Sequence, residues 1–153
     1  MTSRLKRNTA LAAAAVALVG GFEGLRNYAY RDPVGIPTLC FGETRGVKMG
    51  DYKTTAECKA MLADRLVEFE TGMRKCLVRP DRIPDGAYTA FLSASYNIGT
   101  AAFCKSSMAK RANQGDLNGA CDALLMWDKA AGIRLPGLTK RRQKERALCL
   151  SGI

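Results

Sequence analysis

The segment GFEGLRNYAYRDPVGIPTLCFG, residues 21–42, is the most informative part of this chain about its fold. Its aromatic and β-branched residues are interrupted by the turn formers Asp32-Pro33, Gly35 and Pro37. This pattern predicts a small, irregular β-hairpin or meander, which we assign to residues 28–50. The segment opens close to Glu23, where an uncharged first helix is expected to end. A β lobe therefore interrupts a chain that is otherwise helical.

Helical patterns follow this β lobe. Thr54 and Glu57 are spaced as in a capping box, and apolar residues then recur every three or four positions up to Met73, which predicts a helix ending near Cys76. Further helices are expected over residues 85–97, 101–113, 117–127 and 138–150, with a loop at 132–137. The prediction is an α+β fold with a cleft between two lobes. We expect one domain over residues 1–153, made of an N-terminal helix (1–22), the β lobe (28–50) and a helical lobe (53–153).

The composition limits the partners and the chemistry. The 153 residues include 24 Lys+Arg and 14 Asp+Glu, a formal net charge of +10, so we expect an anionic partner: nucleic acid, a membrane surface or a cell-wall polymer. The chain has no histidine, which excludes His-based catalytic triads and the common His-containing zinc and iron sites. No cofactor and no metal ion is expected.

The cysteines indicate the compartment. Six of them are dispersed along the chain and none forms a CxxC pair, which argues against a zinc ribbon, a thioredoxin motif or an iron–sulfur site. In a small basic domain this spacing is typical of three disulfides formed in an oxidising compartment. Spacing alone leaves the pairing open, and buried free thiols in a cytosolic protein are the alternative.

The N-terminus allows two interpretations. Arg4, Lys6 and Arg7 precede an uncharged run at residues 8–22, an order typical of a signal peptide. The run is rich in alanine and shorter than the roughly 20 residues that span a bilayer as a helix. It is therefore either an export segment or a first helix packed in the domain. We expect no cleavage, because a cut near residues 20–21 would leave Glu23 almost at the new terminus.

Without histidine, hydrolytic chemistry falls to carboxyl groups. Asp32 follows Glu23 by nine residues, and Thr38 follows Asp32 by six. A helix end and an adjacent hairpin can place an acid and a carboxylate on opposite sides of a bond, with a hydroxyl holding a water molecule. Glycosidic cleavage needs this arrangement. The alternative is that both carboxylates are solvated surface charges.

The sequence around these residues is more specific. FEG (22–24), YAYRDPVGIPT (28–38) and CFGET (40–44) resemble the catalytic region of the phage-type lysozymes, the endolysin muramidases of glycoside hydrolase family 24. That family's hallmark is a Glu, eight residues, an Asp or Cys, five residues and a Thr, which Glu23, Asp32 and Thr38 match. The resemblance continues through residues 96–107, 113–116, Trp127 and 136–150, and so covers nearly the whole chain.

The resemblance implies a lysozyme-like fold and hydrolysis of the β-1,4 bond between N-acetylmuramic acid and N-acetylglucosamine in bacterial peptidoglycan, for host cell lysis. Carried over by position, Glu23 is the general acid. Asp32 stabilises the transition state and orients the water molecule, with help from Thr38. Asn97 and Phe103 are candidates for lining the sugar cleft, although packing and helix termination explain them equally well.

One position departs from the family pattern. Many members read T-I-G-x-G-H after the hairpin, whereas residues 38–43 here read TLCFGE. Cys40 therefore replaces a glycine, and Glu43 replaces the histidine. We expect Glu43 to be a surface or supporting group rather than a reacting one.

The exported, disulfide-containing branch of the family implies the compartment and the disulfides. The pairs it implies are Cys40–Cys58, Cys76–Cys104 and Cys121–Cys149. It also implies export to the host periplasm, with residues 8–22 acting as a signal-anchor-release segment that associates transiently with the inner membrane. A purely structural first helix is the rival interpretation. The expected partner is the glycan strand of peptidoglycan, and the expected state is a monomer.

Two other classes of function fit parts of the sequence. A cationic wall-binding or membrane-disrupting protein without turnover would account for the charge and for the alanine-rich start. Nucleic-acid binding would account for the basic last helix. No recognition module is found, so nucleic acid is not expected as a partner, and we expect the basic face of residues 138–150 to be solvated. Replacing Glu23 separates the first two classes, because only a hydrolase would lose its activity.

Overall fold

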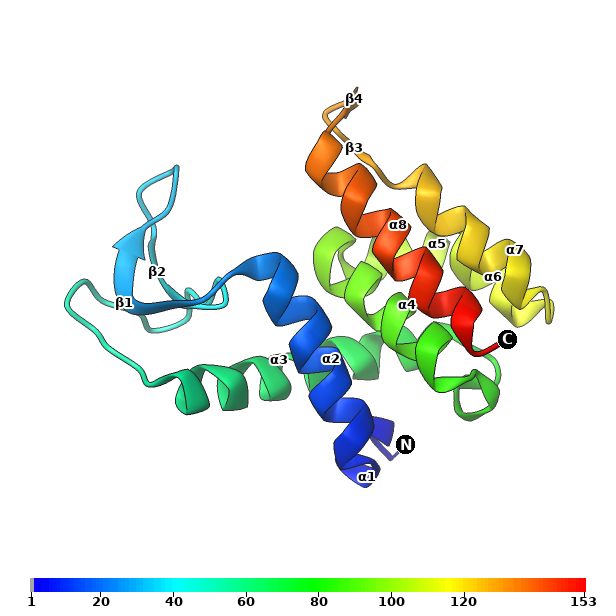
Figure 1. Ribbon diagram of the computed structural model, residues 1–153, viewed down its shortest axis with the longest axis horizontal. Coiled ribbons are helices and arrows are strands. Elements are labelled where there is room, and N and C mark those ends of the chain that lie inside the picture. Colours follow the sequence, from blue (N-terminus) through cyan, green and yellow to red (C-terminus); the bar gives the residue numbers. More distant parts are fainter. Residues whose placement is uncertain (1) are drawn as a thin grey trace.

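The computed structural model describes residues 2–153, in which a small β hairpin is joined to a larger group of helices (Figure 1). This is the α+β arrangement expected from the sequence. The elements are α1 (Arg4–Arg7), α2 (Thr9–Glu23), β1 (Arg26–Arg31), β2 (Pro37–Cys40), α3 (Thr55–Cys76), η1 (Pro80–Arg82), α4 (Asp85–Ile98), α5 (Thr100–Lys105), α6 (Ser107–Asn113), α7 (Leu117–Ala123), η2 (Leu124–Met126), β3 (Lys129–Ala130), β4 (Ile133–Arg134) and α8 (Pro136–Ser151).

The β lobe is an antiparallel pair of strands with one irregularity. Tyr30 pairs with Thr38 near the turn and Arg26 pairs with Cys40 at the base, with a shift of register between them. The chain turns at Gly35, which has a φ of +86° and donates its N–H to the carbonyl of Asp32. A positive φ suits glycine because it has no Cβ. The proline- and glycine-rich sequence therefore forms the predicted hairpin.

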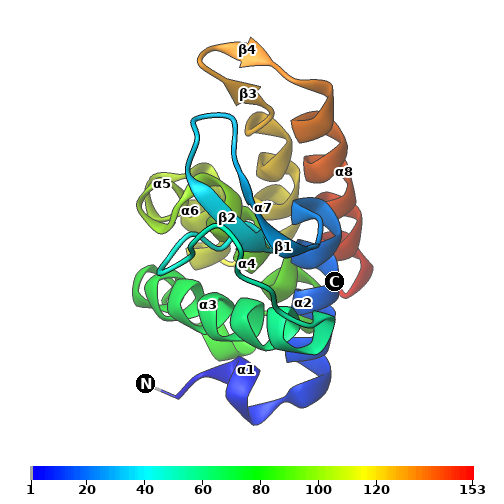
Figure 2. The ribbon, with the colours of Figure 1, turned by 90° about the vertical axis from the view of Figure 1, so that its left-hand side faces the viewer.

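Helix α3 connects the β lobe to the other helices (Figures 1 and 2). It begins with the predicted capping box, in which Thr54 and Glu57 each bond the other's backbone N–H. Its buried side chains Leu62, Leu66 and Met73 follow the three- and four-residue spacing of one helix face. Figure 2, seen from the hairpin side, shows α3 lying below the strands. The hairpin is therefore attached to the helices along α3.

Helix α4 is the centre of the helical lobe and packs against α2, α3, α5 and α8. Tyr88, Phe91 and Leu92 are fully buried, as their spacing predicts. Burying a large apolar side chain stabilises a fold by about 1.5–3 kcal/mol. This core fixes the position of α2, whose last residue is Glu23, relative to α8.

All six cysteines are paired in disulfides. Cys40–Cys58 joins β2 to α3, Cys76–Cys104 joins the end of α3 to α5, and Cys121–Cys149 joins α7 to α8. Each disulfide therefore links different elements of the fold.

Two segments differ from the sequence-based prediction. The helix expected over residues 101–113 is divided into α5 and α6, because the Ser106 hydroxyl accepts the N–H of Ala109 and caps a new helix. The loop expected over residues 132–137 is also wrong. Strands β3 and β4 form a short hairpin that turns at Ala131 and Gly132, with φ values of +51° and +79°, and α8 already begins at Pro136.

The N-terminal residues are part of the folded core. Leu5, Leu11, Ala15 and Val19 are buried against the other helices. Within residues 2–153, no helix has both the length and the hydropathy needed to cross a bilayer.

Candidate active site

Glu23 is the last residue of α2, and Gly24, with a φ of +79°, ends the helix directly after it. The Glu23 side chain is 25% exposed. Its Oε2 accepts a hydrogen bond of 2.8 Å from Nη1 of Arg141 on α8. Its Oε1 faces Gly42, where even an added Cβ would lie 3.7 Å away. One carboxyl oxygen is therefore held by a cation, and the other has no side chain in front of it at this position.

Arg141 is the residue beside Glu23 that the sequence analysis does not single out. We expected the basic residues of the last helix to form a solvated face, but Arg141 is 6% exposed and Arg142 is fully buried. The reason is Glu145, which is fully buried on the same helix and forms ion pairs with both arginines. The i,i+3 and i,i+4 spacing in RRQKE is the signal that could have revealed this cluster.

Asp32 is held by the turn of the β hairpin. Its Oδ1 accepts the backbone N–H groups of Val34 at 3.0 Å and of Ile36 at 2.8 Å. This local turn fixes the orientation of the carboxyl group. Among residues 2–153 no other hydrogen bond reaches its side chain, so Oδ2 is available to a ligand.

Thr38 lies on β2 and is buried, with 4% of its surface exposed. Its hydroxyl donates to the carbonyl of Ile36 at 2.9 Å. Because its one proton is used there, the hydroxyl oxygen can only accept a hydrogen bond from a water molecule. Asp32 and Thr38 are thus joined through the backbone of Ile36.

The packing of the β lobe on α2 sets the relation between Glu23 and the hairpin. Phe41, just after β2, lies against Gly20, where an added Cβ would come within 3.1 Å of the Phe41 ring. The end of α2 lies between the β1–β2 hairpin and α8 (Figure 1). Within residues 2–153 no hydrogen bond joins Glu23 to either Asp32 or Thr38. A hollow of about 410 Å³ opens beside Glu23, lined by Phe22, Leu135, Gly137, Leu138 and Arg141.

Glu43 forms part of the support of the β lobe. It makes a partly buried ion pair with Arg65 of α3, and its carboxylate also accepts the N–H of Arg45. Burial alone would raise the pKa of Glu43, but the hydrogen bonds from Arg65 and Arg45 and the charges of both arginines outweigh burial and lower it. Its carboxylate is therefore occupied in joining the hairpin to α3.

The two other candidates for lining the sugar cleft have structural partners. Phe103 is fully buried, with its ring centroid 5.9 Å from that of Phe91. Asn97 accepts a hydrogen bond of 2.6 Å from Arg142 through its side-chain oxygen. In the part of the chain that the structure describes, no group of three Cys, Asp or Glu side chains is arranged to hold a metal ion.

Comparison with known proteins identifies the family. A family model described as phage lysozyme matches residues 20–145. The chain belongs to the phage lysozyme family. A SAR-endolysin of Bacteriophage PS119 is 38% identical over 149 residues, which cover 94% of this chain and 88% of the relative.

Solved structures agree with this assignment. The active form of the P1 phage endolysin Lyz matches with a TM-score of 0.80 and 32% identity, covering 90% of this chain and 83% of that one. The secreted inactive form of the same endolysin matches with a TM-score of 0.59 and 27% identity, covering 90% and 94%. The fold of this phage lysozyme family member is therefore closer to the active form.

The family settles the class of reaction. The protein has the lysozyme-like α+β fold that was predicted, and it is a glycoside hydrolase, a muramidase that acts on peptidoglycan as a phage endolysin in host cell lysis. A non-catalytic wall-binding or membrane-disrupting protein is not favoured.

Proposed function

We propose that Glu23 protonates the leaving oxygen of the β-1,4 bond between N-acetylmuramic acid and N-acetylglucosamine, and that Asp32 and Thr38 act on the attacking water. The observation that carries this proposal is the environment of the Glu23 carboxyl group. Arg141 occupies Oε2, while Oε1 faces Gly42. A proton on Oε1 can therefore be passed to a sugar oxygen.

The reaction divides the work between two elements. As the bond from C1 to the leaving oxygen breaks, the proton of Glu23 moves to that oxygen and positive charge develops on the sugar ring. The carboxylate of Asp32 stabilises this charge. A water molecule that donates a hydrogen bond to the Thr38 hydroxyl lies on the hairpin side. Its oxygen bonds to C1 while its second proton passes to the Asp32 carboxylate, and proton exchange with solvent then restores the acid form of Glu23 and the carboxylate of Asp32. The turn that fixes Asp32 Oδ1 leaves Oδ2 for this role.

The test is cleavage of purified Gram-negative peptidoglycan by the wild type and by Glu23→Gln, followed by turbidity and by mass spectrometry of the fragments. The expected result is reducing muramic acid ends made by the wild type only. Glu43→Gln is the matched control, because it neutralises a carboxylate outside the proposed triad. Equal cleavage by Glu23→Gln would overturn the role of Glu23, and anhydro-muramic ends would mean a lytic transglycosylase rather than a hydrolase.

We further propose that the enzyme is exported, associates transiently with the inner membrane through residues 8–22, and acts as a monomer in the host periplasm. The relative from Bacteriophage PS119 carries the name SAR-endolysin, in which we take SAR to mean signal-anchor-release. Helix α2 has 15 residues and is about 22 Å long, against roughly 30 Å of hydrocarbon in a bilayer. Such a short segment would hold the membrane weakly, which suits an anchor that is later released.

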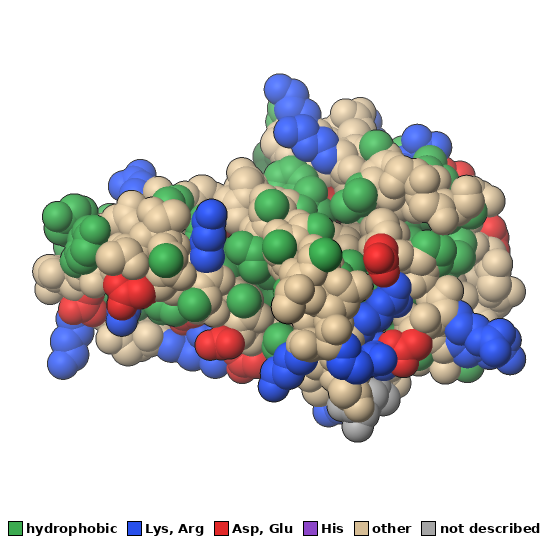
Figure 3. All heavy atoms as spheres, turned by 60° about the horizontal axis from the view of Figure 1, so that its bottom comes forward, with side chains coloured by type: hydrophobic (Ala, Val, Ile, Leu, Met, Phe, Trp, Pro, Cys, Tyr) green, Lys and Arg blue, Asp and Glu red, His purple; other side chains and the backbone are tan. Residues whose placement is uncertain are grey.

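The surface of α2 supports the association with lipid. Ala13, Ala14 and Ala17 are exposed, and a groove of about 610 Å³ with almost wholly apolar walls runs between α2 and α3. Figure 3 shows hydrophobic side chains gathered across the middle of this face. The helix therefore keeps an apolar face even when it is packed on the domain.

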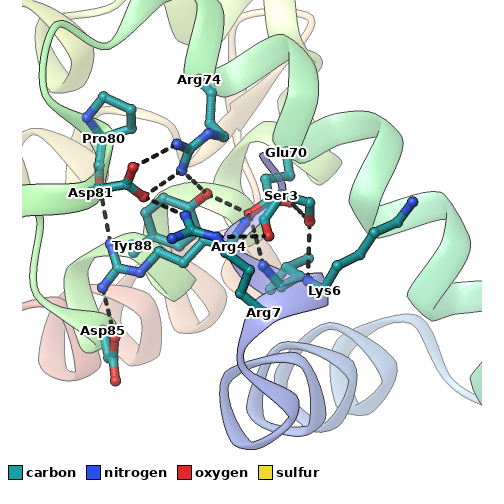
Figure 4. A network of polar contacts seen from close by, with 11 residues as sticks. Ser3, Arg4, Lys6, Arg7, Glu70, Arg74, Pro80, Asp81, Asp85 and Tyr88 are labelled. Carbon is teal, nitrogen blue, oxygen red and sulfur yellow. Dashed lines mark hydrogen bonds and ion pairs between the residues drawn. The ribbon is translucent and has the colours of Figure 1, made fainter. Parts of the chain in front are cut away.

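Arg4 and Arg7, two of the basic residues that precede α2, have specific partners in the folded enzyme (Figure 4). Glu70 of α3 is fully buried and accepts hydrogen bonds from the hydroxyl of Ser3 and from the backbone N–H groups of Arg4 and Leu5. The Arg4 side chain reaches Asp85 at 2.6 Å. After release, these contacts would replace those of the N-terminal residues with the membrane.

Membrane association is tested by fractionating cells that express the full chain. Ala13→Lys and Ala17→Lys change exposed positions, so the folded enzyme should stay active on purified peptidoglycan while leaving the membrane fraction. A matched Ala14→Ser variant should behave as the wild type. A wild type found only in the periplasmic fraction at all times would contradict the tether and leave the muramidase assignment intact.

A further inference from the structure

A row of charged side chains extends from Glu23 into the interior of the helical lobe. Arg141, Glu145 and Arg142 follow one another behind Glu23, all on α8. Glu145 and Arg142 are fully buried and Arg141 nearly so. The four groups alternate in sign, so that each charge lies next to an opposite one.

Arg141 is held on several sides. Its Nε lies 3.4 Å from Glu145 Oε2, and its Nη2 lies 3.3 Å from the carbonyl of Ser93 and 3.4 Å from its hydroxyl. The plane of its guanidinium lies over the ring of Phe22, 4.6 Å from the ring centroid. With these contacts, Nη1 is directed at Glu23. The guanidinium has little freedom to turn away from the carboxyl group.

Glu145 is in turn fixed from α4 and α8. The Ser93 hydroxyl donates to its Oε2 at 2.5 Å, and Arg142 Nε lies 2.9 Å from its Oε1. Arg142 is itself held by Asn97. Burial raises the pKa of Glu145, and the two arginines and Ser93 oppose this. The two arginines favour the charged form of Glu145, because its protonation would leave two buried guanidinium groups without a counter-ion.

Fold stability alone is a poor explanation for this cluster. Buried ion pairs often contribute no more to stability than apolar side chains of the same volume, because their desolvation costs several kcal/mol per ion. The cluster ends at the carboxyl group proposed as the acid. A lone guanidinium beside Glu23 would favour the carboxylate, which has no proton to give. A guanidinium already paired with Glu145 does so less.

We propose that Glu145 is a positioning residue for glycoside cleavage, which orients Arg141 toward Glu23 and offsets the charge of Arg141 beside that carboxyl group. Arg142 opposes this effect, because it also pairs with Glu145 and so reduces how far the carboxylate offsets the charge of Arg141. The inference rests on the proposed role of Glu23 and adds the control of that residue from inside the helical lobe.

Other groups near Glu23 set the background. Lys144 of α8 lies 6.0 Å from the centroid of the Phe22 ring, on the same ring that Arg141 covers. Burial raises the pKa of Tyr96 on α4, and the charge of Glu23 raises it further. On the side of the β lobe, the charge of Glu43 also raises this pKa and that of Arg65 lowers it. None of these groups contacts both Glu23 and Arg141 in the hydrogen bonds and ion pairs of residues 2–153.

The test is the dependence of kcat/KM on pH for two variants of opposite charge change. Glu145→Gln removes the carboxylate that offsets the positive charge of Arg141. The alkaline loss of activity should therefore move to lower pH, by about half a unit or more. Arg142→Gln removes the second cation paired with Glu145, so that the carboxylate offsets the charge of Arg141 more fully. The alkaline loss of activity should therefore move to higher pH. Ser93→Ala changes no charge and should lower kcat without moving the profile. Lys140→Gln, which removes an exposed charge from the same helix, should leave the profile in place.

A merely structural role would lower activity at every pH in proportion to the unfolded fraction, which circular dichroism measures on the same samples. Profiles that stay fixed in both charge variants, or move in the same direction, would overturn the inference. Glu23→Gln is run in the same assay. If it is inactive while the profiles stay fixed, only the role of Glu145 fails. If it remains active, the proposed role of Glu23 fails as well.

Discussion

Glu43 and Arg65 form an ion pair in which one nitrogen of Arg65, Nη2, lies 2.6 Å from both carboxylate oxygens of Glu43. The two side chains are only 13% and 15% exposed. Glu43 directly follows the β hairpin and Arg65 is in the middle of α3, so the pair fastens the lobe that carries Asp32 and Thr38 to the helices. Many family members have a histidine where this chain has Glu43. In this chain an ion pair between a carboxylate and a guanidinium joins the β lobe to α3.

Glu43→Gln should lower the free energy of unfolding by about 1 kcal/mol, because a hydrogen bond to a charged group is lost from a largely buried site. A double-mutant cycle with Arg65→Gln should give a coupling energy of similar size. The neighbouring pair Arg45–Glu68 is exposed, so Arg45→Gln should change stability by less than about 0.5 kcal/mol. Urea unfolding of the two single variants, the double variant and Arg45→Gln measures these free energies. Additive effects of Glu43→Gln and Arg65→Gln would contradict the pairing.

The same pair gives stability a dependence on pH. The pKa of Glu43 is lower in the folded protein than in an unfolded chain, for the reasons given above. Its contribution is therefore complete above the unfolded pKa of about 4.3 and is lost as the pH falls through the lower folded pKa. Urea unfolding from pH 7 to pH 3 should show a smaller acid loss for Glu43→Gln than for the wild type. Identical losses would mean that Glu43 does not contribute.

Glu70→Gln should loosen the N-terminal helices. A charged acceptor for Ser3, Arg4 and Leu5 becomes a neutral amide in a fully buried site, and disturbing buried charge typically costs about 3–5 kcal/mol. Hydrogen exchange should speed up in residues 3–23 before the rest of the molecule, and muramidase activity should fall because Glu23 ends α2. Tyr88→Phe removes the hydroxyl that donates to Glu70 and accepts from Arg74 but leaves the Glu70 carboxylate in place, so it should have a smaller effect. Exchange that rises equally everywhere would argue against a local role.

The disulfides should contribute to stability by similar amounts, because the contribution grows only with the logarithm of the number of residues in the loop that each one closes. Cys40 and Cys58 are separated by 18 residues and the other two pairs by 28, which corresponds to about 3 kcal/mol each in the chain-entropy model. The double variant Cys40→Ala/Cys58→Ala should reduce activity more than Cys121→Ala/Cys149→Ala, because it frees β2, which carries Thr38. Thermal melts and activity of both variants test this. Equal activity loss at equal stability would contradict it.

Patterns that depend on neighbours in the sequence were predictable. The capping box at Thr54 and the turn formers at Asp32–Pro37 are local, and the structure has the long helix and the hairpin where they indicate. The break at Ser106 was missed because serine is also compatible with a helix interior, and only its bond to Ala109 makes it a cap. The β3–β4 hairpin was missed because Ala131 adopts a positive φ that alanine rarely takes.

The candidate site was predictable only in part. The positions of Glu23, Asp32 and Thr38 follow from spacing and resemblance, and their roles are still proposals. The Arg141 contact joins residues 118 positions apart in the chain, so no local pattern indicates it. Charge also misleads in α8: arginine is almost never fully buried unless paired, and although the RRQKE spacing allows the pairing with Glu145, the burial of these side chains depends on how the helix packs.

The length of helix α2 sets the distance between two positions that are held by other parts of the fold. The Glu70 contacts hold the segment just before its start, and Glu23 is its final residue. Each residue of an α-helix adds about 1.5 Å and about 100° of rotation. Inserting a single alanine would therefore turn the Glu23 carboxyl group away from Arg141 while leaving the hydropathy of the segment almost unchanged. The number of residues in α2, and not only its apolar character, is thus constrained by the chemistry at its far end.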